Sequence, residues 1–243
     1  LGCDKVATGH YAMIKGSESD LTLNIPKDRA KDQTYFLYML NQSIMKNLLF
    51  PLQDIDKNEV KNIAKDFDLS IYQKKESMGI CFIGKKDFSS FIKKYINTRH
   101  GNICDEDGYV LGEHDGLFNY TIGQRKGIKI GGNKNYSEKP WFVISKDIDE
   151  NKLIISQDQD RLISSGKVGL ENMSWVRSQP SENFKCKARF RHGGKLISVN
   201  ITKDNNKYYL DMLDGERAIT PGQSAVLYNG DECIGGGIIS SVC

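Results

Sequence analysis

The stretch Lys75-Glu-Ser-Met-Gly-Ile-Cys-Phe-Ile-Gly84 divides the chain into two parts with different sequence patterns. Before it, residues 56–67 predict an amphipathic helix with one buried face, which begins in a capping box at Asp56. After it, residues 88–96 predict a second helix, and short strands with turns follow from residue 101. We therefore expect this stretch to connect two domains.

The same stretch holds Cys81 between Gly79 and Gly84, with lysines on both sides. Glycine permits tight turns, and nearby positive charge lowers the pKa of a thiol, which favours the reactive thiolate. A buried, unreactive cysteine is the competing interpretation, because free cysteines usually pack as small apolar residues. Local chemistry leaves both interpretations open.

The composition is that of a soluble globular protein: 243 residues, 39% hydrophobic and 27% charged. No apolar run approaches the ~20 residues that a membrane span needs. The net charge of +3 allows an anionic partner without demanding one. None of the six cysteines stands in C-x-x-C spacing, which argues against a zinc site and favours free thiols in a reducing compartment.

The N-terminal part has α/β features. Residues 4–14 predict a short strand that runs into Gly9 and His10, and ligands bind at that edge of an α/β sheet. An ordinary turn at His10 is the alternative. Residues 11–15 and 21–25 predict a hairpin, Asp32 is a candidate helix N-cap, and the aromatic run at 35–40 is expected to lie in a core.

The β-rich part begins with hairpins. One is expected to turn at Asp107-Gly108, with Cys104 packed in its strand, and another to turn at residues 147–151. Between them, residues 121–132 interleave glycines with lysines and an arginine. Such a loop can approach phosphates closely, but it can equally be a solvated basic hairpin.

The last part of the chain predicts a small barrel. In the stretch Lys185-Cys-Lys-Ala-Arg-Phe-Arg191, apolar and cationic side chains alternate, so four cations share one face of a strand. Such a row suits a polynucleotide backbone, and it equally suits the polar outer face of a barrel strand. Further short strands at residues 196–201, 208–212 and 224–228, with a glycine-rich strand at 235–239, complete the barrel pattern.

Seven short motifs occur between residues 7 and 239: Ala7-Thr-Gly-His-Tyr11, Lys31-Asp-Gln-Thr-Tyr-Phe-Leu37, Gly79-Ile-Cys-Phe-Ile-Gly84, Gly112-Glu-His-Asp-Gly116, Thr121-Ile-Gly-Gln-Arg-Lys-Gly127, Thr220-Pro-Gly-Gln-Ser-Ala-Val226 and Gly235-Gly-Gly-Ile-Ile239. Together, and in this order, they resemble the tRNA-specific 2-thiouridylase family. The resemblance covers essentially the whole chain.

The resemblance implies an α/β plus β fold. Residues 1–84 would be the remainder of an adenine-nucleotide-hydrolase-like α/β domain that ends in the cysteine loop. Residues 85–156 would form a central tRNA-contacting domain, and residues 157–243 a C-terminal β-barrel.

It also implies an ATP-dependent sulfurtransferase that adenylates the wobble uridine of tRNA and then delivers sulfur from a cysteine persulfide. Cys81 matches the persulfide cysteine and Gly9 matches an ATP contact. The positions that match tRNA contacts are His10, Lys31, Asp32, Gln33, Arg189, Phe190 and Gln223. The implied substrate is Mg-ATP without a protein-bound metal, and the implied partners are tRNA and a cysteine desulfurase or sulfur relay protein. A monomer in the cytoplasm, or in an organelle of a eukaryote, is expected.

Two family features do not occur in this sequence: the Ser-Gly-Gly-x-Asp-Ser phosphate loop and a second catalytic cysteine, which precede the Ala-Thr-Gly-His-Tyr segment in the family. We therefore expect the sequence to be a C-terminal portion that cannot activate uridine by itself. Three other functions stay open: a tRNA-binding module without catalysis, a different ATP-pyrophosphatase-type ligase or synthase, and a cysteine hydrolase that uses Cys81 and His10.

Overall fold

The computed structural model describes residues 2–70, 91–96, 98–131, 136–181, 183–205 and 207–242. The chain forms two compact units. The barrel unit contains residues 1–74, 164–215 and 219–243, and the central unit contains residues 75–163 and 216–218. Cys81 lies outside the described residues.

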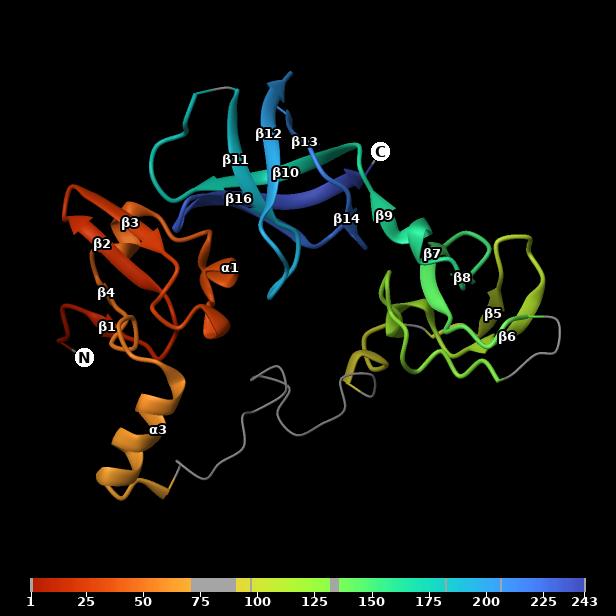
Figure 1. The fold of residues 1–243 in the computed structure, drawn as a ribbon, viewed down its shortest axis with the longest axis horizontal. Helices are drawn as coiled ribbons and strands as arrows, with labels where there is room; N and C mark the ends of the chain where they lie inside the picture. The colour runs from red at the N-terminus through yellow and green to blue at the C-terminus, as the bar shows by residue number, and fades with distance from the viewer. Residues whose placement is uncertain are drawn as a thin grey trace. The chain divides into compact units, whose positions relative to one another are not determined.

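Six strands of the barrel unit close into a β-barrel (Figure 1), in the order β10-β13-β12-β11-β15-β16, with β16 pairing back to β10. Their bounds are β10 Lys167–Trp175, β11 Phe184–Arg189, β12 Ile197–Asp204, β13 Lys207–Met212, β15 Ser224–Asn229 and β16 Glu232–Val242. The alternation expected in β11 is present, since Ala188 and Phe190 lie in the barrel core while Lys185 and Lys187 are exposed. The predicted C-terminal barrel is thus confirmed.

Strand β16 closes the barrel because its glycines allow close backbone approach. A Cβ atom added at Gly235 would lie 2.3 Å from the carbonyl oxygen of Ser174 on β10, and Gly235 has a φ of +149°. A Cβ atom at Gly236 would lie 2.6 Å from the carbonyl oxygen of Ala225 on β15. The glycine-rich end of the sequence therefore fits between its two neighbours as the barrel pattern predicted.

The N-terminal residues pack on the outside of this barrel. Strands β2 (Met13–Ser17) and β3 (Asp20–Asn24) form the expected hairpin, and β3 adds to β16 through the pairs Leu23–Cys233 and Asn24–Glu232. Strand β1 (Val6–Ala7) pairs in parallel with β4 (Leu48–Leu49). The two ends of the sequence thus lie in one unit, and the division at residue 84 stays a prediction.

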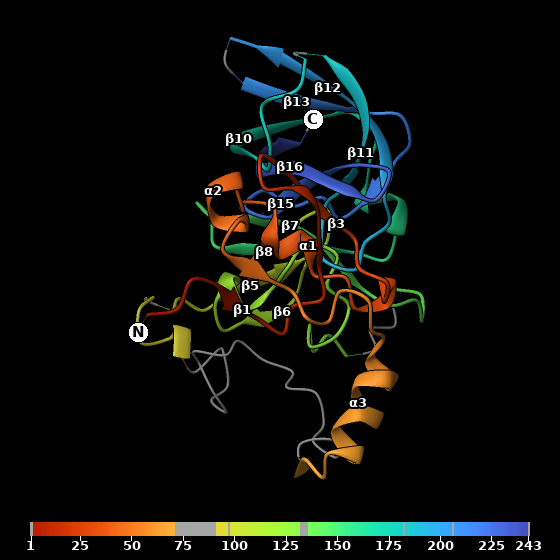
Figure 2. The same cartoon turned by 90° about the vertical axis from the view of Figure 1, so that its left-hand side faces the viewer.

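A second core joins the N-terminal residues to the barrel wall. Leu23, Tyr35 and Met45 pack with Val226 and Tyr228 of β15 in one buried cluster. Short helices η1 (Arg29–Lys31), α1 (Thr34–Leu37) and α2 (Gln42–Met45) lie in this region, and Figure 2 shows α1 and α2 beside β3 and β15.

Helix α3 (Lys57–Asp66) begins where the sequence predicts. The Asp56 carboxylate accepts hydrogen bonds from the backbone N–H groups of Asn58 and Glu59, so it is the N-cap. The expected buried face was wrong for the described residues, because Ile63 is 41% and Phe67 73% exposed. In both views α3 extends away from the sheet (Figures 1 and 2).

The central unit is built on a four-stranded sheet of order β6-β5-β8-β7, in which only the β5–β8 pair is parallel. Its strands are β5 Gly101–Cys104, β6 Val110–His114, β7 Phe142–Asp147 and β8 Lys152–Ser156. The hairpin turn at Asp107-Gly108, the hairpin at 147–151 and the burial of Cys104 are confirmed. Short elements η3 (Leu117–Asn119) and η4 (Gln159–Leu162) follow β6 and β8, and β9 (Ile163–Ser164) pairs with β14 (Glu216–Arg217).

Of the helix expected at 88–96, only residues 91–96 are described. Their backbone makes helical turns, with the Ile96 N–H donating to the Ile92 carbonyl, and the rings of Phe91 and Tyr95 lie 5.2 Å apart. Across the described part of the chain, no helix is long and apolar enough to cross a membrane.

Candidate nucleic-acid interface

The described positions that the resemblance assigns to ATP and tRNA contacts all belong to the barrel unit. His10 follows β1, residues 31–33 lie between η1 and α1, Arg189 ends β11, and Gln223 precedes β15. The structure brings several of these positions together through side chains that bridge the two ends of the sequence.

Gln33 joins the segment of His10 to the segment of Lys31. Its side-chain oxygen accepts a hydrogen bond from the Tyr11 N–H (2.8 Å), and its own N–H donates to the Tyr11 carbonyl (2.9 Å). His10 is half-buried, and its Nδ1 lies 2.8 Å from the Thr8 hydroxyl. The two N-terminal segments are therefore fixed side by side.

Asp32 attaches these segments to the barrel. Its carboxylate is buried, and one oxygen accepts hydrogen bonds from the N–H and the hydroxyl of Thr34, at 2.9 and 2.6 Å. The other oxygen lies 2.6 Å from Nη1 of Arg189, whose side chain is 12% exposed. The prediction of Asp32 as the helix N-cap was wrong by one residue, because the N-cap of α1 is Gln33. The Asp32 carboxylate instead bonds Thr34 in the first turn of α1 and forms the ion pair with Arg189 at the same time.

Arg189 is surrounded by further polar groups. Its guanidinium lies over the Tyr228 ring at 5.1 Å, and the Tyr228 hydroxyl is 3.0 Å from that of Thr34. Burial raises the pKa of Tyr228, so this phenol stays neutral. Within the described residues, Nε of Arg189 is buried without a hydrogen-bond partner.

The row of four cations expected on β11 is therefore incomplete, because the N-terminal segment covers Arg189. Lys185 and Lys187 remain exposed on the outer face, as does Arg191 after the strand. Pairing with Asp32 removes one positive charge from the row. A phosphate backbone on this face would meet the exposed lysines first.

Phe190 and Gln223 occupy different environments. Phe190 is 4% exposed in the barrel core, so any RNA contact at this position falls to its backbone or its neighbours. Gln223 is half-exposed, and its carbonyl accepts a hydrogen bond from the Ile239 N–H (2.7 Å), which ties it to β16.

The aromatic run after Gln33 contains exposed side chains that sequence patterns missed. Tyr35 and Tyr38 are buried as expected, and their hydroxyls bond to Ser224 at 2.9 and 3.1 Å. Phe36, however, is 59% exposed and stacks on His192. The sequence signal is weak, since a run of aromatic residues is also typical of a core.

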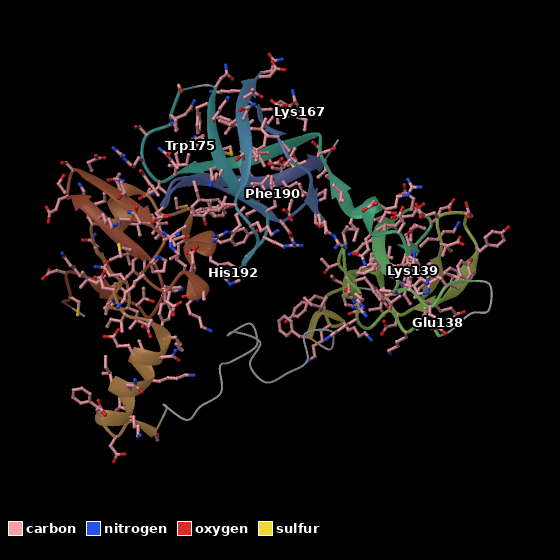
Figure 3. All side chains as sticks on the ribbon, viewed as in Figure 1. Glu138, Lys139, Lys167, Trp175, Phe190 and His192 are labelled. Atoms are coloured by element: carbon pink, nitrogen blue, oxygen red, sulfur yellow. The ribbon has the colours of Figure 1, made fainter. Side chains whose placement is uncertain are left out.

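The basic loop of the central unit has turns instead of a regular hairpin. Arg125, Lys126 and Lys129 are exposed, and Lys129 has a φ of +58°. A cavity of about 280 Å³ is lined by Arg125, Lys129 and Trp141, among others. Figure 3 labels Glu138 and Lys139, which also line it. The hairpin interpretation is therefore wrong for the described residues 121–131, and contact of this loop with phosphates stays a prediction.

Family models match the chain in three consecutive parts. Residues 1–85 match the tRNA methyl transferase HUP domain, residues 89–157 the tRNA methyl transferase PRC-barrel domain, and residues 165–239 the aminomethyltransferase beta-barrel domain. Together with the geometry above, these matches define the class: an α/β segment of HUP type, a PRC-barrel-like middle domain and a C-terminal β-barrel.

Individual relatives give the family. The chain is 44% identical to the tRNA-specific 2-thiouridylase MnmA of Francisella philomiragia over 98% of the chain and 68% of that relative. It is 43% identical to MnmA 2 of Aliarcobacter butzleri over 99% of the chain and 68% of the relative. For MnmA of Oceanobacillus iheyensis the identity is 40%, over the whole chain and 65% of the relative. The chain belongs to the tRNA-specific 2-thiouridylase family, and it spans about two thirds of the length of these relatives.

Proposed function

We propose that this chain acts in the 2-thiolation of the wobble uridine of tRNA. The observation that carries the proposal is identity of 40–44% to three 2-thiouridylases over 98–100% of the chain. The joining of residues 10, 31–33 and 189 into one cluster supports it, because these positions match tRNA contacts in the family.

The proposed reaction has two steps. ATP first adenylates the C2 oxygen of uridine and releases pyrophosphate, which turns a poor leaving group into a good one. In the second step the terminal sulfur of a Cys81 persulfide attacks C2 and AMP leaves. A second cysteine thiolate, the role of the family's other catalytic cysteine, then attacks Cys81 Sγ, which breaks the S–S bond, forms a disulfide with Cys81 and leaves the sulfur on C2. A sulfur donor protein of the desulfurase or relay type supplies the persulfide, and we propose that the protein acts as a monomer in the cytoplasm.

Gly9 supports the use of ATP. Its φ lies outside the left-handed region, and an added Cβ atom would meet only Leu52 Cδ1 at 4.0 Å, an ordinary contact. The fold itself therefore does not require glycine here. An exposed backbone without a side chain suits close approach of a nucleotide, which is the role that the family assigns to this position.

Two described thiols of the β-barrel strands, Cys186 and Cys233, are poor candidates for the sulfur carrier. Burial raises the pKa of Cys186 and of Cys233 to about 12. The thiolate is the form of cysteine that takes up sulfur from a donor. Thiols with a raised pKa therefore react slowly at neutral pH. This favours a cysteine elsewhere, as the family assignment of Cys81 proposes.

Binding of tRNA tests the proposal on the described surface. We expect affinity for unmodified tRNA to fall with salt, and Lys185→Ala or Lys187→Ala to weaken binding and reduce the salt slope by about one unit. Lys167→Ala is the matched control, because β10 lies opposite β11 in the order of the closed barrel. Salt-independent binding, or equal effects of all three substitutions, would contradict the proposed interface.

A tRNA-binding module without catalysis is the second candidate. The described surface favours it as much as the thiolase, since none of the contacts described above requires chemistry at Cys81. A persulfide on Cys81 separates the two candidates, because only the thiolase needs it.

A further inference from the structure

Two exposed rings from distant parts of the sequence meet on the barrel unit. Phe36 of α1 is 59% exposed, and its ring centroid lies 4.6 Å from that of His192, with an angle of 35° between the planes. Figure 3 shows His192 on the segment after β11, beside α1. The two rings are tilted against each other, and because both side chains are exposed, the ring faces that the pair does not cover are open to solvent.

Both rings are held in place. Tyr35 packs edge-on against Phe36 (5.4 Å, 87°), and its hydroxyl donates to the Ser224 carbonyl. His192 lies in a turn closed by the hydrogen bond from the Gly194 N–H to the Arg191 carbonyl, in which Gly193 has a φ of +70°. The platform is therefore formed before a ligand arrives, which lowers the entropic cost of binding.

The surroundings favour a nucleobase over a peptide. Arg191 and Lys195 are exposed on the segment that carries His192. Lys31 precedes helix α1, which carries Phe36. Cations beside exposed aromatic faces are typical of single-stranded nucleic-acid binding, where phosphates contact the cations and bases stack on the rings. In sequence, both rings lie within five residues of positions that match tRNA contacts in the family.

We propose that Phe36 and His192 form a stacking platform for one unpaired base of the bound tRNA. The inference rests on the proposed function and adds a subsite to it. The platform accepts any base, because every base has a π-face. It therefore contributes affinity and positions the bound tRNA, but it does not select a base sequence.

The test measures the affinity of the 243-residue chain for unmodified tRNA at fixed salt. Phe36→Ala and His192→Ala should each weaken binding by roughly fivefold or more. Phe36→Tyr and His192→Phe should retain it, because they keep a planar ring. Phe36→Leu should behave like Phe36→Ala, since it keeps apolar bulk but loses the π-face.

Phe67→Ala is the matched control: Phe67 is a phenylalanine of the same unit that is 73% exposed, and its removal should leave binding unchanged. Wild-type affinity for tRNA in Phe36→Leu would overturn stacking of a base on the Phe36 ring. Unchanged, salt-dependent binding in both alanine variants would overturn the platform while the proposed function stands. Absence of tRNA binding by the wild type would overturn both.

Discussion

Asp32 and Arg189 form the ion pair on which the candidate interface depends. The Asp32 side chain is 3% exposed and that of Arg189 12%. Two charges removed from water are tolerated when they are paired and hydrogen-bonded, and the loss of one partner leaves an uncompensated charge. We therefore assign both residues to positioning of residues 31–33 on the barrel.

Replacing Asp32 should destabilise the barrel unit. We expect Asp32→Ala to lower the free energy of unfolding by about 3–5 kcal/mol. Arg29→Ala, which breaks the exposed pair with Asp231, should cost less than about 1 kcal/mol. Urea unfolding followed by circular dichroism measures both. An Asp32→Ala variant as stable as Arg29→Ala would show that the buried pair does not hold the segment.

A second prediction at the residue scale concerns the Cys186 thiol of the barrel. Burial raises the pKa of Cys186 from 9.0 to about 12, so the thiol stays protonated in the folded protein at neutral pH. Its contribution to the stability of the fold is complete below pH 9 and is lost as the pH rises towards 12. At pH 8 its alkylation in the folded protein should be roughly a thousandfold slower than in urea, from ionisation alone. Mass spectrometry of iodoacetamide-treated protein measures this. Rapid modification of folded Cys186 at pH 8 would contradict it.

At the scale of elements, β16 organises the barrel unit. It pairs with β15, with β10 and with β3, so it closes the barrel and also receives the N-terminal hairpin. Its glycines make this possible, because side chains there would collide with the backbones of neighbouring strands. A single strand thus connects the barrel to the segment that carries residues 31–33.

A methyl group at Gly235 should disturb this closure. Gly235→Ala combines an unfavourable φ with a collision against Ser174, and we expect a loss of about 3–5 kcal/mol. Gly230→Ala, where φ is +60° but space is open, should cost about 1–2 kcal/mol. Thermal unfolding compares the two. Equal losses would mean that backbone strain alone, and not close approach of β10, requires glycine at 235.

At the scale of the whole molecule, the candidate interface combines the two ends of the sequence. Residues 10 and 31–33 come from the N-terminal segment, whereas Arg189 and His192 come from the barrel, and all lie in one compact unit. Any change that separates the hairpin from β16 should therefore weaken RNA binding without altering a single contact residue.

Local patterns predicted the elements better than their environments. The N-cap at Asp56, the turn at Asp107-Gly108 and the alternation in β11 depend on neighbours in sequence, so the sequence alone was sufficient to predict them. The pairing of Arg189 with Asp32 and the exposure of Phe36 depend on which surfaces meet across the fold. Periodicity carries no information about such long-range contacts, and resemblance to a family supplied the positions of the site without their geometry.

We propose Cys81 as the sulfur carrier through which this chain serves tRNA thiolation. To test this most directly, the chain is incubated with a cysteine desulfurase and ³⁵S-labelled cysteine. The ³⁵S label bound to the protein is then quantified in the absence of reductant. Wild type and Cys186→Ser should carry a persulfide, and Cys81→Ser should not. Label on Cys81→Ser equal to that on wild type would contradict the account.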